Sequence, residues 1–291
     1  MVIRRIVRKI IGGTRAWLEE ETPPDVTRHR IGEHAYDWLK AAFETVMRDP
    51  ECAQRPAYVW GMLQGAGQAR TLGIPRVSAM EFGVAQGRGL LSLERIGARV
   101  SEISGIRVDV VGFDTGTGLT SPVDYRDVPN LLWAGRFPMD VEALRKRLTT
   151  GSLVLGSIAE TLPAFLDGGP PQVAFVSVDV DLYSSTVDCL RLFEADPLLL
   201  LPRVYCYFDD IHGFTYSDCN GELLAVAEFN ASHPLRQICK IHGLKFFVPK
   251  AAREAKWVEC FYIAHVFDHE HYARRSSIAT PEQDRRNLGL R

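Results

Sequence analysis

Hydrophobic residues in the first part of the chain follow a helical spacing. The first run consists of Tyr36, Leu39, Ala42, Phe43 and Val46. These positions share one helical face, and Asp49-Pro50 ends the pattern. A second segment, Ala57–Leu72, has the same character. No alternation typical of strands precedes Val77, so we expect residues 1–72 to form an N-terminal helical cap.

From Val77 the pattern changes to short apolar runs separated by helical segments. Five of these runs predict strands: Val77–Phe82, Arg107–Phe113, Leu153–Leu155, Val173–Val178 and Arg203–Phe208. Strands that alternate with helices are typical of a parallel, doubly wound sheet. A closing pair of strands, Leu244–Val248 and Val258–Val266, is joined by a turn at Pro249. We therefore expect an α/β domain with a Rossmann-like sheet over residues 73–272.

Both ends of the chain carry several arginines. The first residues, MVIRRIVRKIIGG, place isoleucines on one helical face with arginines beside them. This pattern fits a helix packed on its own domain or on the second subunit of a homodimer, and it also fits a helix on a membrane surface. We favour packing, and the arginines interrupt the apolar stretch that a signal peptide needs. Residues 273–291 are polar, which predicts a solvated tail.

Composition and charge are those of an ordinary globular protein, with 46% hydrophobic and 24% charged residues. The net charge of −2 and the lack of a basic stripe argue against a nucleic-acid partner. No apolar run reaches the roughly 18 residues that a membrane-spanning helix needs. The six cysteines are scattered without a C-x-x-C pair, so we expect reduced thiols in a cytoplasmic protein.

The first strand leads into a glycine-rich turn, EFGVAQGRG, which opens the next helical segment. Gly83, Gly87 and Gly89 allow a sharp turn and the close approach of a ligand. Their order, G-x-x-x-G-x-G, differs from the G-x-G-x-x-G of dinucleotide sites. Glu81 suits a ligand with an ammonium or sulfonium group better than one with phosphates. Plain α/β packing also uses such turns, but we assign these four residues to cofactor binding, because the pattern resembles motif I of the class I S-adenosylmethionine-dependent methyltransferases.

The second and third strands also end in residues suited to a ligand, and ligands of open α/β sheets bind beyond the carboxyl ends of the strands. Asp114 ends the second strand, where an acid can accept hydrogen bonds from ribose hydroxyls. A helix cap or an Asx turn is the alternative for Asp114, since TGTG follows. Ser157 after the third strand leaves room for a cofactor base or for substrate. It could equally form a capping box with Glu160, and we give the cap more weight.

Four carboxylates follow the fourth and fifth strands. Asp179 and Asp181 follow the fourth, and Asp209 and Asp210 follow the fifth. They would repel one another if unpaired, and a bound divalent cation is the simplest way to keep them ionised together. Oxygen ligands favour Mg²⁺, Mn²⁺ or Ca²⁺ over zinc. Helix caps or pairs with Arg or Lys would explain one or two of the four, less easily all of them.

Five motifs, in this order and spacing, resemble the macrocin O-methyltransferase-like family: EFGVAQGRG, GFDTGTGL, ETLPAFL, DVDLYSST and YFDDIHG. The resemblance covers about residues 77–229 and implies methylation of sugar hydroxyls with S-adenosylmethionine and a divalent metal. It also implies a seven-stranded sheet whose last strand is antiparallel. In that family the residues that match Asp179, Asp209 and Asp210 hold Mg²⁺, and the match to Asp181 has been proposed as general base. Residues 115–140 have no counterpart that we can place, which leaves the substrate less defined than the reaction.

We therefore predict an O-methyltransferase that uses S-adenosyl-L-methionine and Mg²⁺ or Mn²⁺ to methylate a hydroxyl of a small molecule, such as a sugar or another diol. Asp181 or His212 would take the proton from that hydroxyl, and we rank Asp181 first. Two other classes compete with this interpretation. The missing third glycine argues against an NAD(P)-dependent oxidoreductase, and the intact carboxylate set argues against a non-catalytic methyltransferase-like assembly module.

Three histidines near the end of the last strand, His265, His269 and His271, have the spacing H-x-x-x-H-x-H. Such a set can bind a transition metal. The last strand runs against the others, so we expect these residues at the far edge of the sheet. We interpret them as packed or solvent-exposed histidines.

Overall fold

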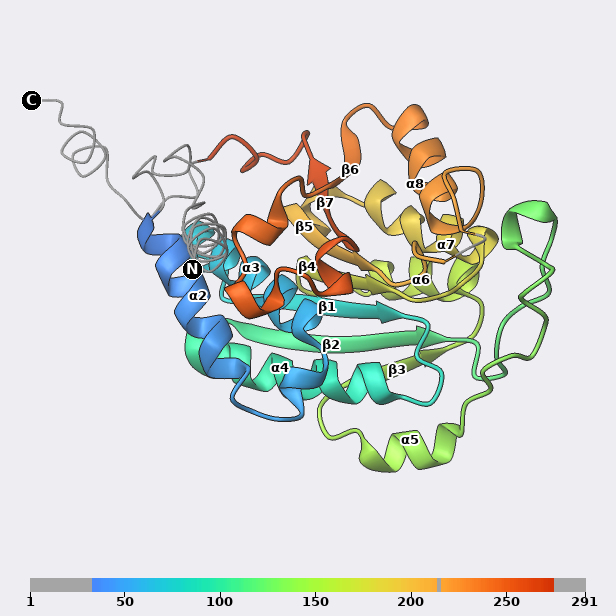
Figure 1. Cartoon of the computed structure of the whole chain (residues 1–291), viewed down its shortest axis with the longest axis horizontal. Coiled ribbons are helices and arrows are strands. Elements are labelled where there is room, and N and C mark those ends of the chain that lie inside the picture. Colours follow the sequence, from blue (N-terminus) through green and yellow to red (C-terminus); the bar gives the residue numbers. More distant parts are fainter. Residues whose placement is uncertain (1–32, 214–215, 275–291) are drawn as a thin grey trace, which may run out of the picture. The chain divides into compact units, whose positions relative to one another are not determined.

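Seven strands form one sheet in the computed structural model, which describes residues 33–213 and 216–274 (Figure 1). Their order is β3-β2-β1-β4-β5-β7-β6. The strands are β1 Arg76–Phe82, β2 Arg107–Asp114, β3 Ser152–Leu155, β4 Val173–Val178, β5 Leu200–Phe208, β6 Arg236–Lys240 and β7 Phe261–Val266. Strands β1 to β5 pair in parallel, and β7 runs antiparallel to both β5 and β6. The predicted doubly wound sheet with an antiparallel last strand is confirmed.

The central strands are buried on both faces of the sheet. Every residue of β4 is buried, as is every residue of β1 except Arg76. Central parallel strands typically form such continuous apolar runs, so these strands could be predicted from the sequence. The strand order reverses between β1 and β4, and open α/β sheets bind their ligands beyond the strand ends at such a point.

The sixth strand was predicted at the wrong place. Leu244–Phe246 forms a 3-10 turn, and the edge strand β6 lies earlier, at Arg236–Lys240. Leu244 and Val248 are both buried, and the amide of Val248, just after the turn, donates a hydrogen bond to the Leu244 carbonyl. In β6 only Ile238 is buried, so this edge strand has no apolar run that would reveal it.

Helices cover both faces of the sheet. They are α2 Glu33–Val46, α3 Pro56–Leu72, α4 Arg88–Ser104, α5 Val141–Arg147, α6 Ile158–Asp167, α7 Tyr183–Leu190 and α8 Gly221–Ser232. Helices α3 and α4 pack against β1, β2, β4 and β5. Helices α6, α7 and α8 contribute to the hydrophobic core on the other face (Figure 1). The two helices expected from the spacing before residue 73 are present as α2 and α3.

Helix α3 is buried around most of its circumference. Phe43 of α2 packs edge-on against Trp60 of α3, with 5.5 Å between ring centroids, and Trp257 lies 6.4 Å from the same ring. On its other side, Gln68 donates a hydrogen bond of 2.7 Å to the carbonyl of Arg203 in β5. Helix α3 therefore lies between the sheet and a second layer of side chains.

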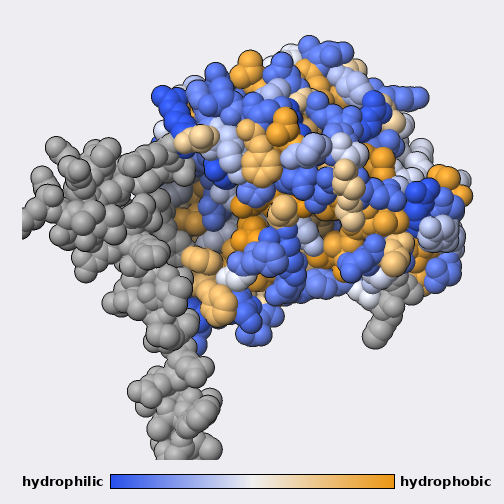
Figure 2. Space-filling view, turned by 90° about the horizontal axis from the view of Figure 1, so that it is seen from above, coloured by the Kyte–Doolittle hydropathy of each residue, from blue (hydrophilic) through white to orange (hydrophobic). Residues whose placement is uncertain are grey.

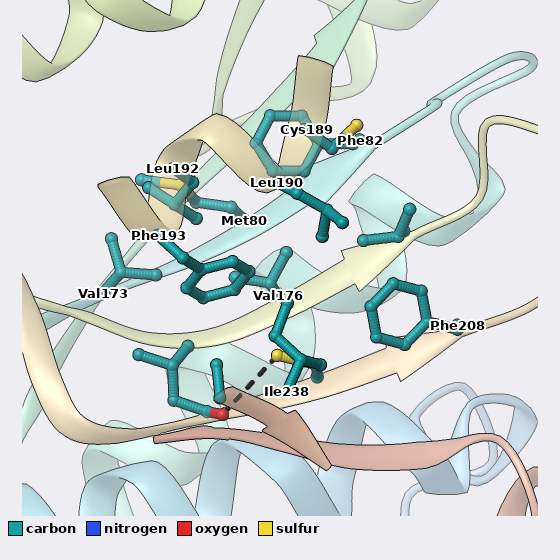
Figure 3. Close-up of a cluster of buried hydrophobic side chains, with 14 of the residues drawn as sticks. Met80, Phe82, Val173, Val176, Cys189, Leu190, Leu192, Phe193, Phe208 and Ile238 are labelled. Carbon is teal, nitrogen blue, oxygen red and sulfur yellow. Dashed lines mark hydrogen bonds between the residues drawn. The ribbon is translucent and has the colours of Figure 1, made fainter. Parts of the chain in front are cut away.

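The core beside α7 fixes the carboxyl ends of the central strands. Figure 3 shows Phe82 of β1 and Phe208 of β5 in one cluster with Leu190 of α7 and with Phe193, which follows it. All four side chains are at most 2% exposed. Burying each such side chain contributes about 1.5–3 kcal/mol. This packing holds the ends of β1, β4 and β5 in place, and so positions the residues that follow them.

The face seen in Figure 2 mixes hydrophilic and hydrophobic residues. Among the described residues, no helix has the length and apolar character needed to cross a membrane. The N-terminal segment, for which we expect packing or membrane contact, falls outside the described residues, as do residues 275–291 of the tail. The three domain ranges, the homodimer and the cytoplasmic location stay predictions.

Candidate active site

A cavity of about 760 Å³ opens beyond the carboxyl ends of β1 to β5. Nine of the residues predicted for the site line it: Glu81, Gly83, Gly89, Asp114, Ser157, Asp179, Asp181, Asp209 and Asp210. Gly87 and His212 are not among its lining residues. The fold therefore brings together side chains that are spread over some 130 positions of the sequence.

The glycine turn after β1 is tightly packed. Gly83 has a φ of +83°, and a Cβ there would collide with the backbone carbonyl of Asp179. A Cβ at Gly89 would collide with the carboxylate of Glu81, and one at Gly87 would collide with Leu144 of α5. Gly87 also has a φ of +80°, so the backbone conformation and the neighbouring Leu144 both favour glycine, and Gly87 does not line the cavity.

Glu81 is buried below the start of α4 and is only 1% exposed. Its Oε1 accepts a hydrogen bond of 2.7 Å from the hydroxyl of Tyr58, while its Oε2 is buried without a partner among the described residues. Burial raises the pKa of Glu81 to about 8. An unpartnered buried carboxylate oxygen on a cavity wall fits a cationic group of a ligand.

Asp114 holds the glycine turn in place. Its Oδ2 accepts hydrogen bonds from the amides of Val84 and Ala85, at 2.8 and 2.9 Å. Its Oδ1 accepts one of 2.7 Å from the amide of Gly116, which is the Asx turn considered from the sequence. The carboxylate also lines the cavity, so the predicted contact with ribose hydroxyls remains compatible with its position.

Ser157 stands at the N-cap position of α6, but the predicted capping box is wrong. Its hydroxyl makes no capping hydrogen bond. The amides of Glu160 and Thr161 bond instead to the backbone carbonyl of Ser157, at 3.1 and 2.9 Å. The hydroxyl is therefore available on the cavity wall, as the predicted role in cofactor binding requires.

Three carboxylates converge where β4 and β5 end. Single oxygen atoms of Asp179, Asp209 and Asp210 lie within 4.8 Å of one another. In the part of the chain that the structure describes, this is the one group of acidic, His or Cys side chains with such geometry. Burial, followed by the neighbouring carboxylates Asp209 and Asp181, raises the pKa of Asp179 to about 7. Three converging carboxylate oxygens fit Mg²⁺ or Mn²⁺.

Asp181 lies beside this triad and does not belong to it. Its φ of +60° is a left-handed conformation that non-glycine residues adopt mainly at functional sites or under strain. Its amide donates a hydrogen bond of 3.0 Å to Asp210. Burial raises the pKa of its carboxyl group, whereas nearby Arg136 and a hydrogen bond with Tyr216 act in the opposite direction.

His212 is exposed and does not line the cavity. Its pKa is lowered by partial burial and by the positive charges of Lys256 and Lys240. Asp181, by contrast, lines the cavity.

Three residues of the site were missed from the sequence. Arg55 precedes α3 and lines the cavity, and its charge acts on Glu81, Asp179 and Asp209. Tyr58 reaches Glu81 from α3.

Glu222 in the first turn of α8 is fully buried, and its Oε2 accepts a hydrogen bond of 3.0 Å from the amide of Asp210. An acid in a first helical turn is ordinarily a surface residue that complements the helix dipole, so its sequence position gave no signal.

Residues 115–140 form one wall of the cavity. The backbone of Leu119 pairs with Arg136 and Gly135, which closes the base of this segment. Asp127, fully buried, accepts hydrogen bonds from the amide and hydroxyl of Ser184 at 2.7 and 3.0 Å. It also accepts one of 2.7 Å from the amide of Val123. Asp127 thus attaches the wall to the start of α7.

Replacing Asp127 with alanine is expected to lower the free energy of unfolding by about 1–3 kcal/mol, because three donors lose their acceptor. Thermal denaturation followed by circular dichroism would measure the change. Asp167→Ala is the matched control, since Asp167 is exposed at the end of α6 and should change stability by about 0.5 kcal/mol or less. Equal melting temperatures of the two variants would contradict the attachment.

The three histidines lie away from the cavity. His265 in β7 pairs with Arg203, near the amino end of β5, and its Nδ1 forms a hydrogen bond of 2.9 Å with the hydroxyl of Tyr272. His269 is 3% exposed, and its Nδ1 accepts a hydrogen bond of 2.9 Å from the amide of His271. One ring nitrogen of each residue is thus hydrogen-bonded to the segment that follows β7, whereas Nε2 of His269 is buried without a partner among the described residues.

The chain matches no protein-family model and no curated protein sequence. It is similar to the crystal structure of CalS11, described as a calicheamicin methyltransferase, with 22% identity, 77% of this chain and 91% of that chain covered, and a TM-score of 0.47. The apo structure of CalS11, described as a TDP-rhamnose 3'-O-methyltransferase, gives 21% identity, 77% and 92% coverage and a TM-score of 0.40. Cofactor-bound Rv0187 from MTB gives 19% identity, 86% and 99% coverage and a TM-score of 0.39.

Proposed function

We propose that this protein is an S-adenosylmethionine-dependent, Mg²⁺- or Mn²⁺-dependent O-methyltransferase that acts on a hydroxyl group of a small molecule. One observation carries the proposal: a single cavity at the strand-order reversal contains both the Asp179–Asp209–Asp210 triad and a glycine turn above a buried carboxylate. The volume of about 760 Å³ is typical of sites for small molecules.

The methyl donor would lie along the ends of β1 to β3. The unpartnered Oε2 of Glu81 suits the ammonium group of its amino-acid part, and Asp114 suits the ribose hydroxyls. Ser157 offers a free hydroxyl to the base. When bound, S-adenosylmethionine supplies a methyl group that is already activated by the sulfonium charge. The chain's own task is to orient the donor and to exclude water from it.

The acceptor would lie beside the ends of β4 and β5. Asp179, Asp209 and Asp210 would hold a divalent cation, which supplies Lewis acidity and a fixed orientation when bound. Asp181, at the edge of the triad, would take the proton of the acceptor hydroxyl, a contribution of roughly 10²–10⁴ in rate. A substrate with two adjacent hydroxyls, such as a sugar or a catechol-like diol, fits this arrangement best.

The site is less suited to the two rival functions. A nicotinamide dinucleotide needs its pyrophosphate at the start of the helix after β1. Here the carboxyl group of Glu81 packs directly against Gly89 at that place, and it presents no positive charge to a phosphate. A non-catalytic module would have no use for three carboxylates that destabilise one another without a cation.

Calorimetric titration of S-adenosylhomocysteine into the purified protein, with Mg²⁺ and then with EDTA, tests the proposal. We expect a dissociation constant in the micromolar range under both conditions, because the donor residues differ from the metal ligands. A separate titration of Mg²⁺ should show binding that EDTA abolishes. Absence of S-adenosylhomocysteine binding, or tight binding of NADH observed by fluorescence, would contradict the proposal.

A further inference from the structure

A chain of three buried polar side chains connects α3 with the two central strands. Glu81 of β1 and Ser177 of β4 are direct partners in the strand pairing, so their side chains lie on the same face of the sheet. Tyr58 of α3 inserts its hydroxyl between them. None of the three is more than 1% exposed. Buried polar groups in such a place need a reason, since an apolar core would avoid their desolvation.

The hydrogen bonds among these three side chains run from Ser177 through Tyr58 to Glu81. The hydroxyl of Ser177 donates to the oxygen of Tyr58 at 2.9 Å. The hydroxyl of Tyr58 then donates to Oε1 of Glu81 at 2.7 Å. The hydroxyl of Ser177 therefore orients the hydroxyl of Tyr58 toward Glu81. The carboxyl group of Glu81, which receives the last hydrogen bond, borders the cavity.

The two carboxylate oxygens of Glu81 therefore have different surroundings. Oε1 is held by Tyr58, whereas Oε2 is buried and has no partner among the described residues. The charged groups that act on this carboxyl are Arg55 beside α3, Asp179 after β4 and Asp114 at the end of β2. Burial is the main cause of the raised pKa of Glu81, and the two aspartates add to it, whereas the hydrogen bond from Tyr58 and the charge of Arg55 favour the ionised form.

We infer that Tyr58, itself oriented by Ser177, is a positioning residue that directs Oε2 of Glu81 toward the ammonium group of the bound methyl donor. The inference rests on the proposed function, because it assumes that the cavity binds S-adenosylmethionine. It predicts that loss of the Tyr58 hydroxyl weakens only those ligands that carry the amino-acid part. A purely structural role of Tyr58 would affect all ligands of the cavity alike.

The test compares two ligands by calorimetry: S-adenosylhomocysteine, which has the ammonium group, and 5′-methylthioadenosine, which lacks the whole amino-acid part. In Tyr58→Phe the dissociation constant of S-adenosylhomocysteine should rise about tenfold, as for loss of a hydrogen bond to a charged group. The constant for methylthioadenosine should stay within about twofold. Tyr205→Phe is the matched control, because Tyr205 lies in β5 and does not line the cavity.

A second variant keeps the inference testable if Tyr58→Phe does not fold. Ser177→Ala retains Tyr58 and should weaken S-adenosylhomocysteine by roughly threefold without affecting methylthioadenosine. Unchanged binding of both ligands, or equal weakening of both, would overturn the role of Tyr58. If the unaltered protein binds neither ligand, the proposed function fails instead, so the two failures are distinguishable.

Discussion

Asp209→Asn is expected to weaken the binding of Mn²⁺ by about 100-fold or more and to reduce methyl transfer by roughly 10³-fold. Asp209 supplies one of the three converging carboxylate oxygens. Asparagine keeps the size of the side chain and can still accept the hydrogen bond of 2.6 Å from the hydroxyl of Tyr207. The change therefore removes one charge with little disturbance of packing. Electron paramagnetic resonance of free Mn²⁺ measures the affinity directly.

The same variant should be more stable than the original protein when no metal is present. Asp209 and its neighbours repel one another, and burial adds to the cost of their charges. Removing one charge relieves part of this repulsion, so the melting temperature in EDTA should rise. Asp167→Asn, at an exposed position, should change neither quantity. A Mn²⁺ affinity within twofold of the original would contradict the metal site.

Gly89→Ala should weaken S-adenosylhomocysteine by about 10–100-fold, which is the cost of inserting a methyl group into a filled space. The new Cβ would collide with the carboxylate of Glu81, which is held from below by Tyr58. Either the start of α4 or Glu81 must shift, and both border the cavity. Calorimetric titration in EDTA measures this loss separately from any effect on metal.

Gly97→Ala in the same helix is the control for this variant. A Cβ at Gly97 would meet the ends of Val110 and Met62 at 3.2 and 3.3 Å, and alanine favours the helix over glycine. We expect its affinity for S-adenosylhomocysteine to stay unchanged. Similar losses in the two variants would indicate a general effect on α4 and would argue against the close contact between Gly89 and Glu81.

The predictable parts of the fold were those with a strong local pattern. Strand β4 was found with its bounds unchanged, because burial on both faces makes it continuously apolar. Strand β6 was missed, since only Ile238 of its residues is buried. The acids after β4 and β5 could be found because parallel strands place their carboxyl ends at one edge of the sheet.

The rest of the site depends on pairings between distant positions. Tyr58 lies 23 residues from Glu81 and 119 residues from Ser177 in the sequence, and no spacing rule connects them. Asp127 and Ser184 are likewise 57 residues apart. Glu222 became recognisable as part of the site only through its hydrogen bond to the amide of Asp210. Such contacts follow from tertiary packing, which a local pattern does not contain.

The burial of α3 has a consequence for synthesis on the ribosome. This helix is completed before any strand of the sheet, yet its Gln68 bonds to Arg203, a residue 135 positions later. At about 5–20 residues per second, β5 emerges roughly 7–27 s after α3. During that interval the apolar sides of the helix lack their final partners. During synthesis, helix α3 therefore remains without its partner strand β5 for several seconds or longer. In this interval the nascent chain can associate with chaperones or with other chains.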